Sequence, residues 1–251
     1  MAVNPNSTVE PNIGFVGLGV MGEPMCLNLA KKTRSKVIGF DLFPDPLERL
    51  AEEGVARAES LEYLADQCEL IFLSLPDGEA VKSVCCRPDG LVAHMKASST
   101  LVDMSTSPVG LTRELAAQCQ ERHIDFADAP VARTREAAIR GDLSVMVGCD
   151  ATLFDRLLPV LKLMGSDVTH CGEVGSGQIM KILNNMVLFQ NVCALTEAIA
   201  VARRNSVNLD TLLSVLSKGS GDSFALRNHG IKSMLPRIFP SRAFSTRYAK
   251  K

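Results

Sequence analysis

A glycine-rich turn between an apolar strand and a helix constrains the fold of this chain more than any other feature. The apolar residues 12–17 predict a buried strand, and a helical pattern follows from Gly22 to about Lys32. The turn between them fits G-x-G-x-x-G and consists of Gly17, Leu18, Gly19, Val20, Met21 and Gly22. The first glycine allows the tight bend, the second lets a pyrophosphate approach the backbone, and the third lets helix and strand pack closely. Because N–H groups at a helix start favour phosphate, the turn predicts a dinucleotide site.

An acidic residue at the end of the next predicted strand supports this interpretation. Residues 36–41 form that strand, and Asp41 closes it. A carboxylate at this position binds the ribose 2′-hydroxyl and repels a 2′-phosphate, so NAD is the expected cofactor. Arg34 and Lys36 are close enough in sequence to keep NADP possible. The alternative is a solvated acid in a loop.

Short apolar strands alternate with helical segments over about the first 170 residues. Further strands are predicted at residues 69–75, 100–103, 124–129, 144–147 and 168–170, and helices at 60–67, 78–85, 108–122 and 151–164. Strands without a polar alternation are buried on both faces. The order predicts an α/β fold, a doubly wound parallel sheet of the Rossmann type.

The pattern changes near the glycine-rich segment 172–177. Residues 178–204 have apolar positions at helical spacing without a breaker, and residues 209–216 and 223–235 are also helical in pattern. We therefore expect an NAD(P)-binding domain at residues 1–174 and an all-helical domain at 175–251.

Composition excludes several other classes of protein. The chain has 27 Lys plus Arg and 28 Asp plus Glu, a net charge of -1, so no basic surface for nucleic acid is expected. Its eight cysteines include no C-x-x-C pair, which favours free thiols and no metal site. No signal peptide and no uncharged apolar run of about 20 residues are present, so a cytoplasmic enzyme without a membrane partner is expected.

Five motifs occur in a fixed order along nearly the whole chain. They are FVGLGVMGEPMCLNLAK (15–31), FLSLPD (72–77), LVDMSTSP (101–108), DAPV (128–131) and GSGQIMKILNN (175–185). Together they resemble the β-hydroxyacid dehydrogenases, a family that includes 3-hydroxyisobutyrate dehydrogenase and sulfolactaldehyde reductase. The resemblance implies an NAD(P)-dependent oxidoreductase that interconverts a small anionic semialdehyde and its β-hydroxy acid. It also implies a Rossmann-type domain joined by a long helix to a helical domain.

The resemblance also assigns roles to individual residues. Lys181 matches the catalytic lysine, and Asn184 or Asn185 matches an asparagine that contacts the substrate. Cofactor contacts fall on Leu75 and Pro76, and on Thr106 near the nicotinamide. For the asparagines, ordinary helix hydrogen bonding is the alternative, and the cofactor-loop residues can be loop structure alone.

Lys181 also has a physical case of its own. A hydride transfer at carbon requires a proton transfer at the attached oxygen, and the nicotinamide does not supply that proton. Burial and a nearby cationic ring depress the pKa of a lysine from about 10.4 toward the range of a proton shuttle. The alternative for a lysine in this apolar helix is a side chain that snorkels from an exposed face.

The three residues after DAPV depart from the family. Much of the family has serine-glycine-glycine there, which holds the substrate through the serine hydroxyl and the close backbone, whereas this chain has Ala132, Arg133 and Thr134. Sulfolactaldehyde reductases look similar here, with arginine-threonine in place of the glycines. A guanidinium suits carboxylate, sulfonate or phosphate, so Arg133 and Thr134 are candidate substrate contacts. The alternative is that Arg133 is a solvated charge.

The last residues resemble a family segment that continues further. In FSTRYAKK, residues 244–251, Lys251 matches a second lysine that approaches the nicotinamide. The helical domain is therefore expected to be incomplete relative to the family, with a homo-oligomer only if it is complete enough. The alternative function is a truncated, non-catalytic relative that binds NAD(H).

Overall fold

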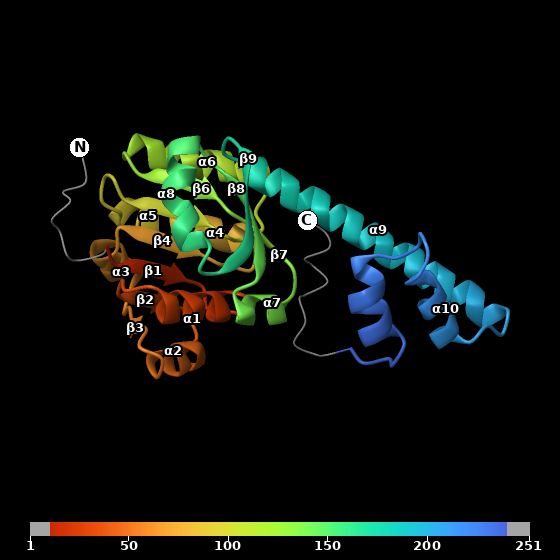
Figure 1. Ribbon diagram of the computed structural model, residues 1–251. Helices are drawn as coiled ribbons and strands as arrows, with labels where there is room; N and C mark the ends of the chain where they lie inside the picture. Colours follow the sequence, from red (N-terminus) through yellow and green to blue (C-terminus); the bar gives the residue numbers. More distant parts are fainter. Residues whose placement is uncertain (1–10, 240–251) are drawn as a thin grey trace. The chain divides into compact units, whose positions relative to one another are not determined.

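The first unit of the protein is built on one sheet. The computed structural model describes residues 11–239, and the chain divides into the units Met1–Lys181 and Ile182–Lys251. The strands lie in the order β3-β2-β1-β4-β5-β6-β8-β7, and β9 pairs with β8 (Figure 1). Their bounds are β1 (Ile13–Val16), β2 (Val37–Phe40), β3 (Ala56–Arg57), β4 (Leu70–Leu73), β5 (Thr100–Asp103), β6 (Asp125–Asp128), β7 (Val131–Ala132), β8 (Leu143–Gly148) and β9 (Gly165–Gly172).

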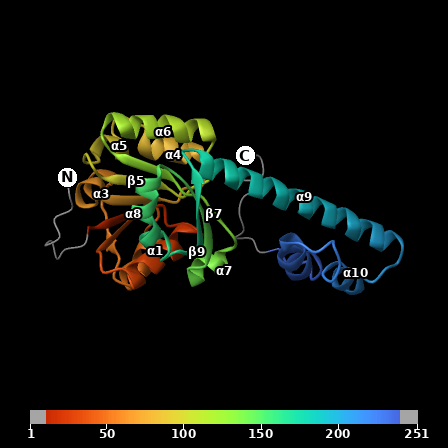
Figure 2. The ribbon, with the colours of Figure 1, turned by 45° about the horizontal axis from the view of Figure 1, so that its top comes forward.

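Helices cover both faces of this sheet, which confirms the predicted doubly wound α/β fold (Figure 2). One face carries α1 (Gly22–Lys32), α2 (Pro44–Ala51) and α8 (Ala151–Leu161). The other carries α3 (Leu61–Gln67), α4 (Gly78–Cys85), α5 (Leu91–His94) and α6 (Val109–Glu121). The short helix α7 (Arg135–Arg140) contacts α1.

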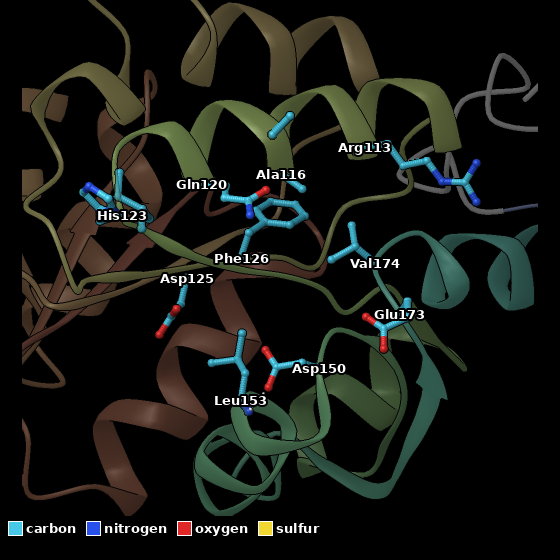
Figure 3. Close-up of a pocket in the computed structure, with 12 residues that line it drawn as sticks. Arg113, Ala116, Gln120, His123, Asp125, Phe126, Asp150, Leu153, Glu173 and Val174 are labelled. Atoms are coloured by element: carbon cyan, nitrogen blue, oxygen red, sulfur yellow. Dashed lines mark hydrogen bonds between the residues drawn. The ribbon is translucent and has the colours of Figure 1, made fainter. Parts of the chain in front are cut away.

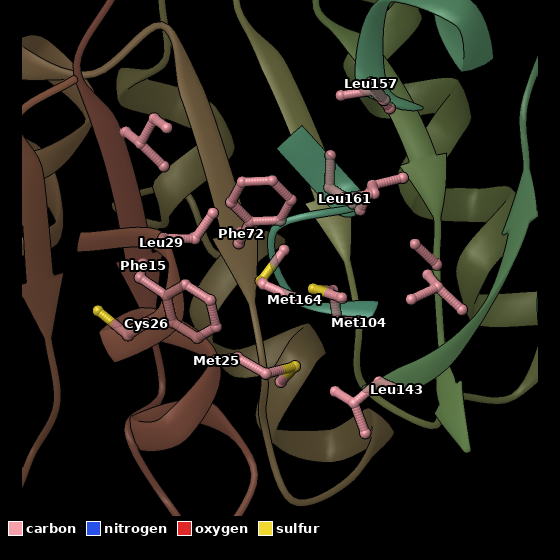
Figure 4. Close-up of a cluster of buried hydrophobic side chains, with 14 of the residues drawn as sticks. Phe15, Met25, Cys26, Leu29, Phe72, Met104, Leu143, Leu157, Leu161 and Met164 are labelled. Atoms are coloured by element: carbon pink, nitrogen blue, oxygen red, sulfur yellow. The ribbon is translucent and has the colours of Figure 1, made fainter. Parts of the chain in front are cut away.

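Each face of the sheet packs its own apolar core. On the α1 face, the rings of Phe15 and Phe72 stack with centroids 6.0 Å apart, beside Met25 and Leu29 (Figure 4). All four side chains are fully buried. Truncating such a phenylalanine to alanine costs about 3–5 kcal/mol, so this core fixes β1 and β4 side by side.

The sheet departs from the predicted parallel arrangement at one edge. It is parallel from β3 through β6, but β8 runs antiparallel to β6 and to β7. Strand β7 has two residues and follows β6 after only Ala129 and Pro130. Because β6 and β7 both run antiparallel to β8, β7 continues in the direction of β6. The chain reverses between Ala132 and Leu143, in the segment that carries α7.

The second unit is all-helical, as predicted, over its described residues 182–239. Helix α9 (Ser176–Arg204) starts in the first unit and continues into the second, where α10 (Leu209–Leu216) and the π-helical segment η1 (Leu226–Met234) follow. Leu195, Ile199, Leu213 and Leu226 form its small core. The segment 226–234 is thus helical as expected, but wound more widely than an α-helix.

Helix α9 also has the length and composition to cross a membrane. Its most apolar window has a mean hydropathy of 1.4, and 17% of that window is buried. The core helix of a soluble protein meets the same criterion, so one such helix is weak evidence. The absence of a membrane partner therefore remains a prediction.

Candidate functional site

The glycine turn has the geometry that its pattern predicts. Gly17 has φ +89°, and a Cβ atom there would overlap the carbonyl oxygen of Ser74. At Gly22 a Cβ atom would overlap the carbonyl oxygen of Gly17, because α1 begins directly against the end of β1. A Cβ atom on Gly19 would meet nothing within 4 Å. The second glycine therefore faces open space, where a pyrophosphate can approach the backbone.

The start of α1 is the second part of the predicted pyrophosphate site. No side chain caps it, and its first-turn acid, Glu23, is paired with Arg49 at 2.6 Å between Oε1 and Nε. In its first turn, Glu23 N–H and Met25 N–H donate to the carbonyl oxygens of Gly19 and Met21, and Pro24 has no N–H. The open space at Gly19 and the uncapped start of α1 are compatible with a bound pyrophosphate.

Asp41 lies beside the glycine turn, at the end of β2. Its Oδ2 atom accepts a hydrogen bond of 2.6 Å from the backbone N–H of Leu18, and Oδ1 accepts one of 2.9 Å from Phe43. Strands β1 and β2 are parallel neighbours, with Val16 opposite Phe40, so their ends meet at one edge. The side chain is half-buried, which leaves part of the carboxylate accessible to a ribose.

The other predicted cofactor contacts lie at the same edge of the sheet. Leu75 and Pro76 follow β4, and half-buried Thr106 follows β5, the next parallel strand. The backbone N–H of Leu75 donates a hydrogen bond of 2.9 Å to Ser105 Oγ, which joins the two loops. Between β1 and β4 the order of strands reverses, and dinucleotides bind at such a switch point. The roles of the individual loop residues stay predictions.

Lys181 is buried in the first two turns of α9. Its residue is 6% exposed, although Ile179 and Met180 on the same helix are 40% and 48% exposed. This burial does not fit a lysine that snorkels from an exposed face. The structure thus places Lys181 in a buried environment. Its chemical role stays a prediction.

The predicted asparagines follow on α9, in the second unit. Asn184 is exposed and Asn185 is half-buried, and Asn184 Nδ2 lies 3.4 Å from Asn185 Oδ1. Their contact with a substrate stays a prediction. Lys251 lies outside the described residues.

Arg133 occupies a backbone conformation that suits glycine. Its φ is +85°, which agrees with the glycine that much of the family has at this position. Its guanidinium is bound by its own chain: Nη1 donates to Asp142 Oδ1 at 3.0 Å and to Ser166 Oγ at 2.9 Å, and Nη2 donates to Asp167 Oδ2 at 2.5 Å. Ser166 lowers the pKa of both carboxyls most; after it, Arg140 and then Arg133 lower that of Asp142, and Arg133 lowers that of Asp167. Arg133 is therefore no free solvated charge, and a substrate anion would have to exchange with these carboxylates.

Thr134 stands next to Arg133 and precedes α7. It is half-buried, and its side chain makes no capping hydrogen bond to the helix. Part of its side chain is accessible, and its contact with a substrate stays a prediction. The two arginines of α7, Arg135 and Arg140, are exposed.

Two buried polar residues near Lys181 were not predicted as functional. Asp128 ends β6 and Gln178 lies in the first turn of α9, and both are fully buried. Burial raises the pKa of Asp128 to about 6, with a smaller contribution from Asp103, against hydrogen bonds from Gly175 and Gln178 that lower it. Both residues stand in motifs that carry the family resemblance, Asp128 in DAPV and Gln178 in GSGQ. Their place in these motifs is the sequence feature that could have identified them as functional.

A groove in the first unit is lined by a different set of residues. It has a volume of ≈ 630 Å³ and runs between α6 and the start of α8, with Phe126 and Val174 among its lining (Figure 3). Arg113, Asp125, Asp150 and Glu173 supply charges of both signs. No residue predicted to bind cofactor or substrate lines it. Within residues 11–239, no group of three His, Cys, Asp or Glu side chains is placed to hold a metal ion.

Comparison with known families accounts for both units. Residues 12–172 match the NAD binding domain of 6-phosphogluconate dehydrogenase. Residues 175–251 match the NAD-binding region of NADP-dependent 3-hydroxyisobutyrate dehydrogenase. The two matches meet at the start of α9.

Individual proteins show the same relationship. The chain is 35% identical to 2-(hydroxymethyl)glutarate dehydrogenase of Eubacterium barkeri over 85% of this chain and 71% of that protein. It is 34% identical to 3-hydroxyisobutyrate dehydrogenase of Pseudomonas aeruginosa over 95% of this chain and 78% of that protein. The solved structure of Mycobacterium tuberculosis 3-hydroxyisobutyrate dehydrogenase with L-serine is 31% identical, with a TM-score of 0.80, over 94% of this chain and 77% of that one.

Proposed function

The chain belongs to the β-hydroxyacid dehydrogenase family of NAD(P)-dependent oxidoreductases, and we propose that it interconverts a small anionic semialdehyde and the corresponding β-hydroxy acid, with a preference for NAD. The observation that carries the proposal is the burial of Lys181 at the start of α9. A lysine in such a place is suited to proton transfer rather than to solvation.

The preference for NAD rests on Asp41 and on the two residues after it. The carboxylate is held by Leu18 and Phe43, so it cannot easily turn away from a 2′-phosphate. Leu42 and Phe43 are uncharged and strongly exposed. An arginine near this point accommodates the 2′-phosphate in NADP-binding proteins. Asp41 would repel the 2′-phosphate of NADP, and neither residue 42 nor residue 43 is a cation that could offset this repulsion. Both features support a preference for NAD.

The proposed mechanism divides the reaction between cofactor and protein. Bound NAD(H) supplies or accepts the hydride at the substrate carbon. Lys181 gives a proton to the carbonyl oxygen in the reductive direction and takes one from the hydroxyl in the oxidative direction. The glycine turn would hold the pyrophosphate, Asp41 would hold the ribose, and Leu75, Pro76 and Thr106 would contact the cofactor.

The anionic group of the substrate is assigned to Arg133 and Thr134, with Asn184 or Asn185 as further contacts. Arg133 would leave Asp142 and Asp167 to bind the substrate, because those carboxylates now occupy its donors. Both ion pairs are substantially exposed, and solvent screens such pairs so strongly that they contribute little to stability. An exchange of one anion for another at this guanidinium is therefore inexpensive.

The test is a substrate panel of carboxylate, sulfonate and phosphate semialdehydes, with NADH and NADPH, on the wild type and three variants. Lys181→Ala is expected to abolish turnover and to leave NADH binding, measured by fluorescence, largely intact. Arg133→Ala is expected to raise KM for the preferred anion. Asp167→Asn, the matched control, removes a competing carboxylate and is expected to lower that KM.

Two results would overturn parts of this proposal. Tight NADH binding by the wild type without turnover of any panel member would favour a non-catalytic NAD(H)-binding protein. Unchanged KM values in Arg133→Ala for every anion would remove Arg133 from the substrate site. The expected cytoplasmic location and homo-oligomeric state stay predictions.

A further inference from the structure

The start of α9 is held by two buried polar side chains for which the proposed mechanism has no use. Asp128 and Gln178 are fully buried, and each makes hydrogen bonds to backbone groups far away in sequence. Burying an amide or a carboxylate is costly unless every polar atom finds a partner. Such a pair is therefore informative about what the fold must hold in place.

Asp128 caps α9 from a neighbouring strand. Its Oδ1 atom accepts a hydrogen bond of 2.7 Å from the N–H of Gly175, and Oδ2 accepts one of 2.8 Å from the N–H of Gln178. Helices are usually capped by a residue at their own N-terminus. Here the carboxylate comes from the end of β6 and ties the first turn of α9 to the sheet.

Two glycines make room for this carboxylate. A Cβ atom on Gly148 would lie 2.5 Å from Asp128 Oδ1, and one on Gly177 would lie 2.8 Å from Oδ2. The end of β8 and the first turn of α9 thus close around the carboxylate without side chains between them. The cap is a tightly enclosed contact, so small displacements of α9 are resisted.

Gln178 ties the same turn to the loop after β5. Its Nε2 atom donates a hydrogen bond of 2.8 Å to the carbonyl oxygen of Ser105, and its Oε1 atom accepts one of 3.1 Å from the N–H of Ser107. These two backbone groups flank Thr106. The amide therefore holds both sides of the residue predicted to lie near the nicotinamide.

Asp103, at the end of β5, also holds the loop after β5. Asp103 Oδ1 accepts a hydrogen bond of 2.9 Å from the N–H of Ser105, and Asp103 Oδ2 accepts one of 3.1 Å from Ser107 Oγ. Ser105 Oγ in turn accepts a hydrogen bond from the backbone N–H of Leu75. One network thus joins the loops that carry Leu75 and Thr106 to the helix that carries Lys181.

We propose that Asp128 and Gln178 are positioning residues that set Lys181 against the Thr106 loop, an inference that rests on the proposed role of Lys181. Lys181 follows Gln178 by three positions, which places it one turn along the same helix. Because a helical turn is rigid, fixing Gln178 at both ends of its amide fixes the origin of the lysine side chain. A misplacement of about 1 Å costs about 10²-fold in rate.

Two isosteric variants and one control test this inference on the full chain. Gln178→Glu keeps the shape but replaces the donor to Ser105 with an acceptor, and Asp128→Asn replaces one acceptor of the cap with a donor. The control, Asp150→Asn, weakens a carboxylate cap on α8, where Asp150 accepts the N–H of Leu153 at 3.0 Å. Each variant is measured for kcat, KM, NADH binding and amide hydrogen exchange.

In Gln178→Glu and Asp128→Asn we expect kcat to fall by about 10-fold to 10²-fold, with KM and NADH binding unchanged. Amide exchange is expected to accelerate at residues 175–181 in both, and at 105–107 in Gln178→Glu. In Asp150→Asn only the start of α8 should exchange faster, and kcat should stay at the wild-type value.

The outcomes separate this inference from the proposed function. If exchange accelerates at residues 175–181 but kcat does not fall, the two side chains are structural only and the inference is wrong. If exchange is unchanged there, the network does not hold α9 and the inference is also wrong. If the wild type turns over no substrate in the panel, the proposed function fails, and the exchange data alone decide whether Asp128 and Gln178 hold the helix.

Discussion

The backbone N–H of Leu18 donates a hydrogen bond of 2.6 Å to Oδ2 of Asp41, which joins the glycine turn to the end of β2. The same carboxylate accepts the N–H of Phe43. The acid that is proposed to bind the ribose is therefore also part of the turn that is proposed to bind the pyrophosphate. The two halves of the cofactor site are built as one structure.

Replacing Asp41 should therefore weaken the binding of NADH more than the binding of NADPH. In Asp41→Asn the charge is removed while one oxygen remains to accept an N–H. Hydrogen bonds to charged groups contribute about 1.5–3 kcal/mol, so the Kd for NADH should rise by about 10-fold or more. The Kd for NADPH should rise less or fall, because repulsion of the 2′-phosphate is lost. Fluorescence titrations with both cofactors give the ratio, and an unchanged ratio would contradict the role of Asp41.

Two glycines of the same turn should respond differently to alanine. Gly19→Ala adds a methyl group that meets no protein atom, so the fold should keep its stability while the methyl group obstructs the pyrophosphate. Gly22→Ala drives a methyl group into the carbonyl of Gly17, and α1 must move away from β1. We expect a normal Tm with weak NADH binding for Gly19→Ala, and a clearly lowered Tm for Gly22→Ala. Equal Tm values would contradict this division.

The sequence was sufficient for features that depend on nearby residues. The turn from Gly17 to Gly22, Asp41 at a strand end and the long helix of Lys181 are local patterns, and the structure shows each element where it was predicted. Strand β7 escaped prediction because two residues have no recognisable period. The sheet was predicted to be parallel throughout because the antiparallel pairing of β8 with β6 and β7 is a tertiary contact that no local pattern encodes.

The contacts that hold the site could not be predicted from a sequence pattern. Asp128 and Gln178 are separated by 50 residues, and only the fold brings them together. The partners of Arg133, Ser166 and Asp167, are likewise 33 and 34 residues away. A buried acid or amide is recognisable in sequence as unusual, but its partner is decided by tertiary packing.

Arg133 offers a test of backbone strain that does not depend on the substrate. Arg133→Ala and Arg133→Gly lose the same ion pairs with Asp142 and Asp167. At φ +85° a Cβ atom costs about 1–2 kcal/mol, and glycine avoids this cost in the folded state. Glycine loses part of that advantage because its unfolded chain is more flexible. Urea denaturation should still show Arg133→Gly to be the more stable, and the reverse order would mean that the turn adopts another conformation in solution.

The pKa of Asp128 predicts a pH dependence of stability with a definite sign. Burial raises this pKa from 3.8 to about 6, so the folded protein binds the proton more tightly than the unfolded chain does. The stabilisation is complete below about pH 4 and is lost as pH rises through about 6, an effect of about 3 kcal/mol. Asp142 and Asp167 act in the opposite direction, since their pKa values are lowered and their contribution is lost as pH falls.

The difference between wild type and Asp128→Asn isolates this one group, because the other carboxylates are common to both proteins. The substituted asparagine does not titrate, so the free energy of unfolding of the variant should rise relative to that of the wild type between pH 4 and pH 6. It should then stay level above about pH 7. Urea denaturation across that range measures the difference. A difference that is flat with pH would show that Asp128 keeps an ordinary pKa, and its enclosure by Gly148 and Gly177 would then not exclude water.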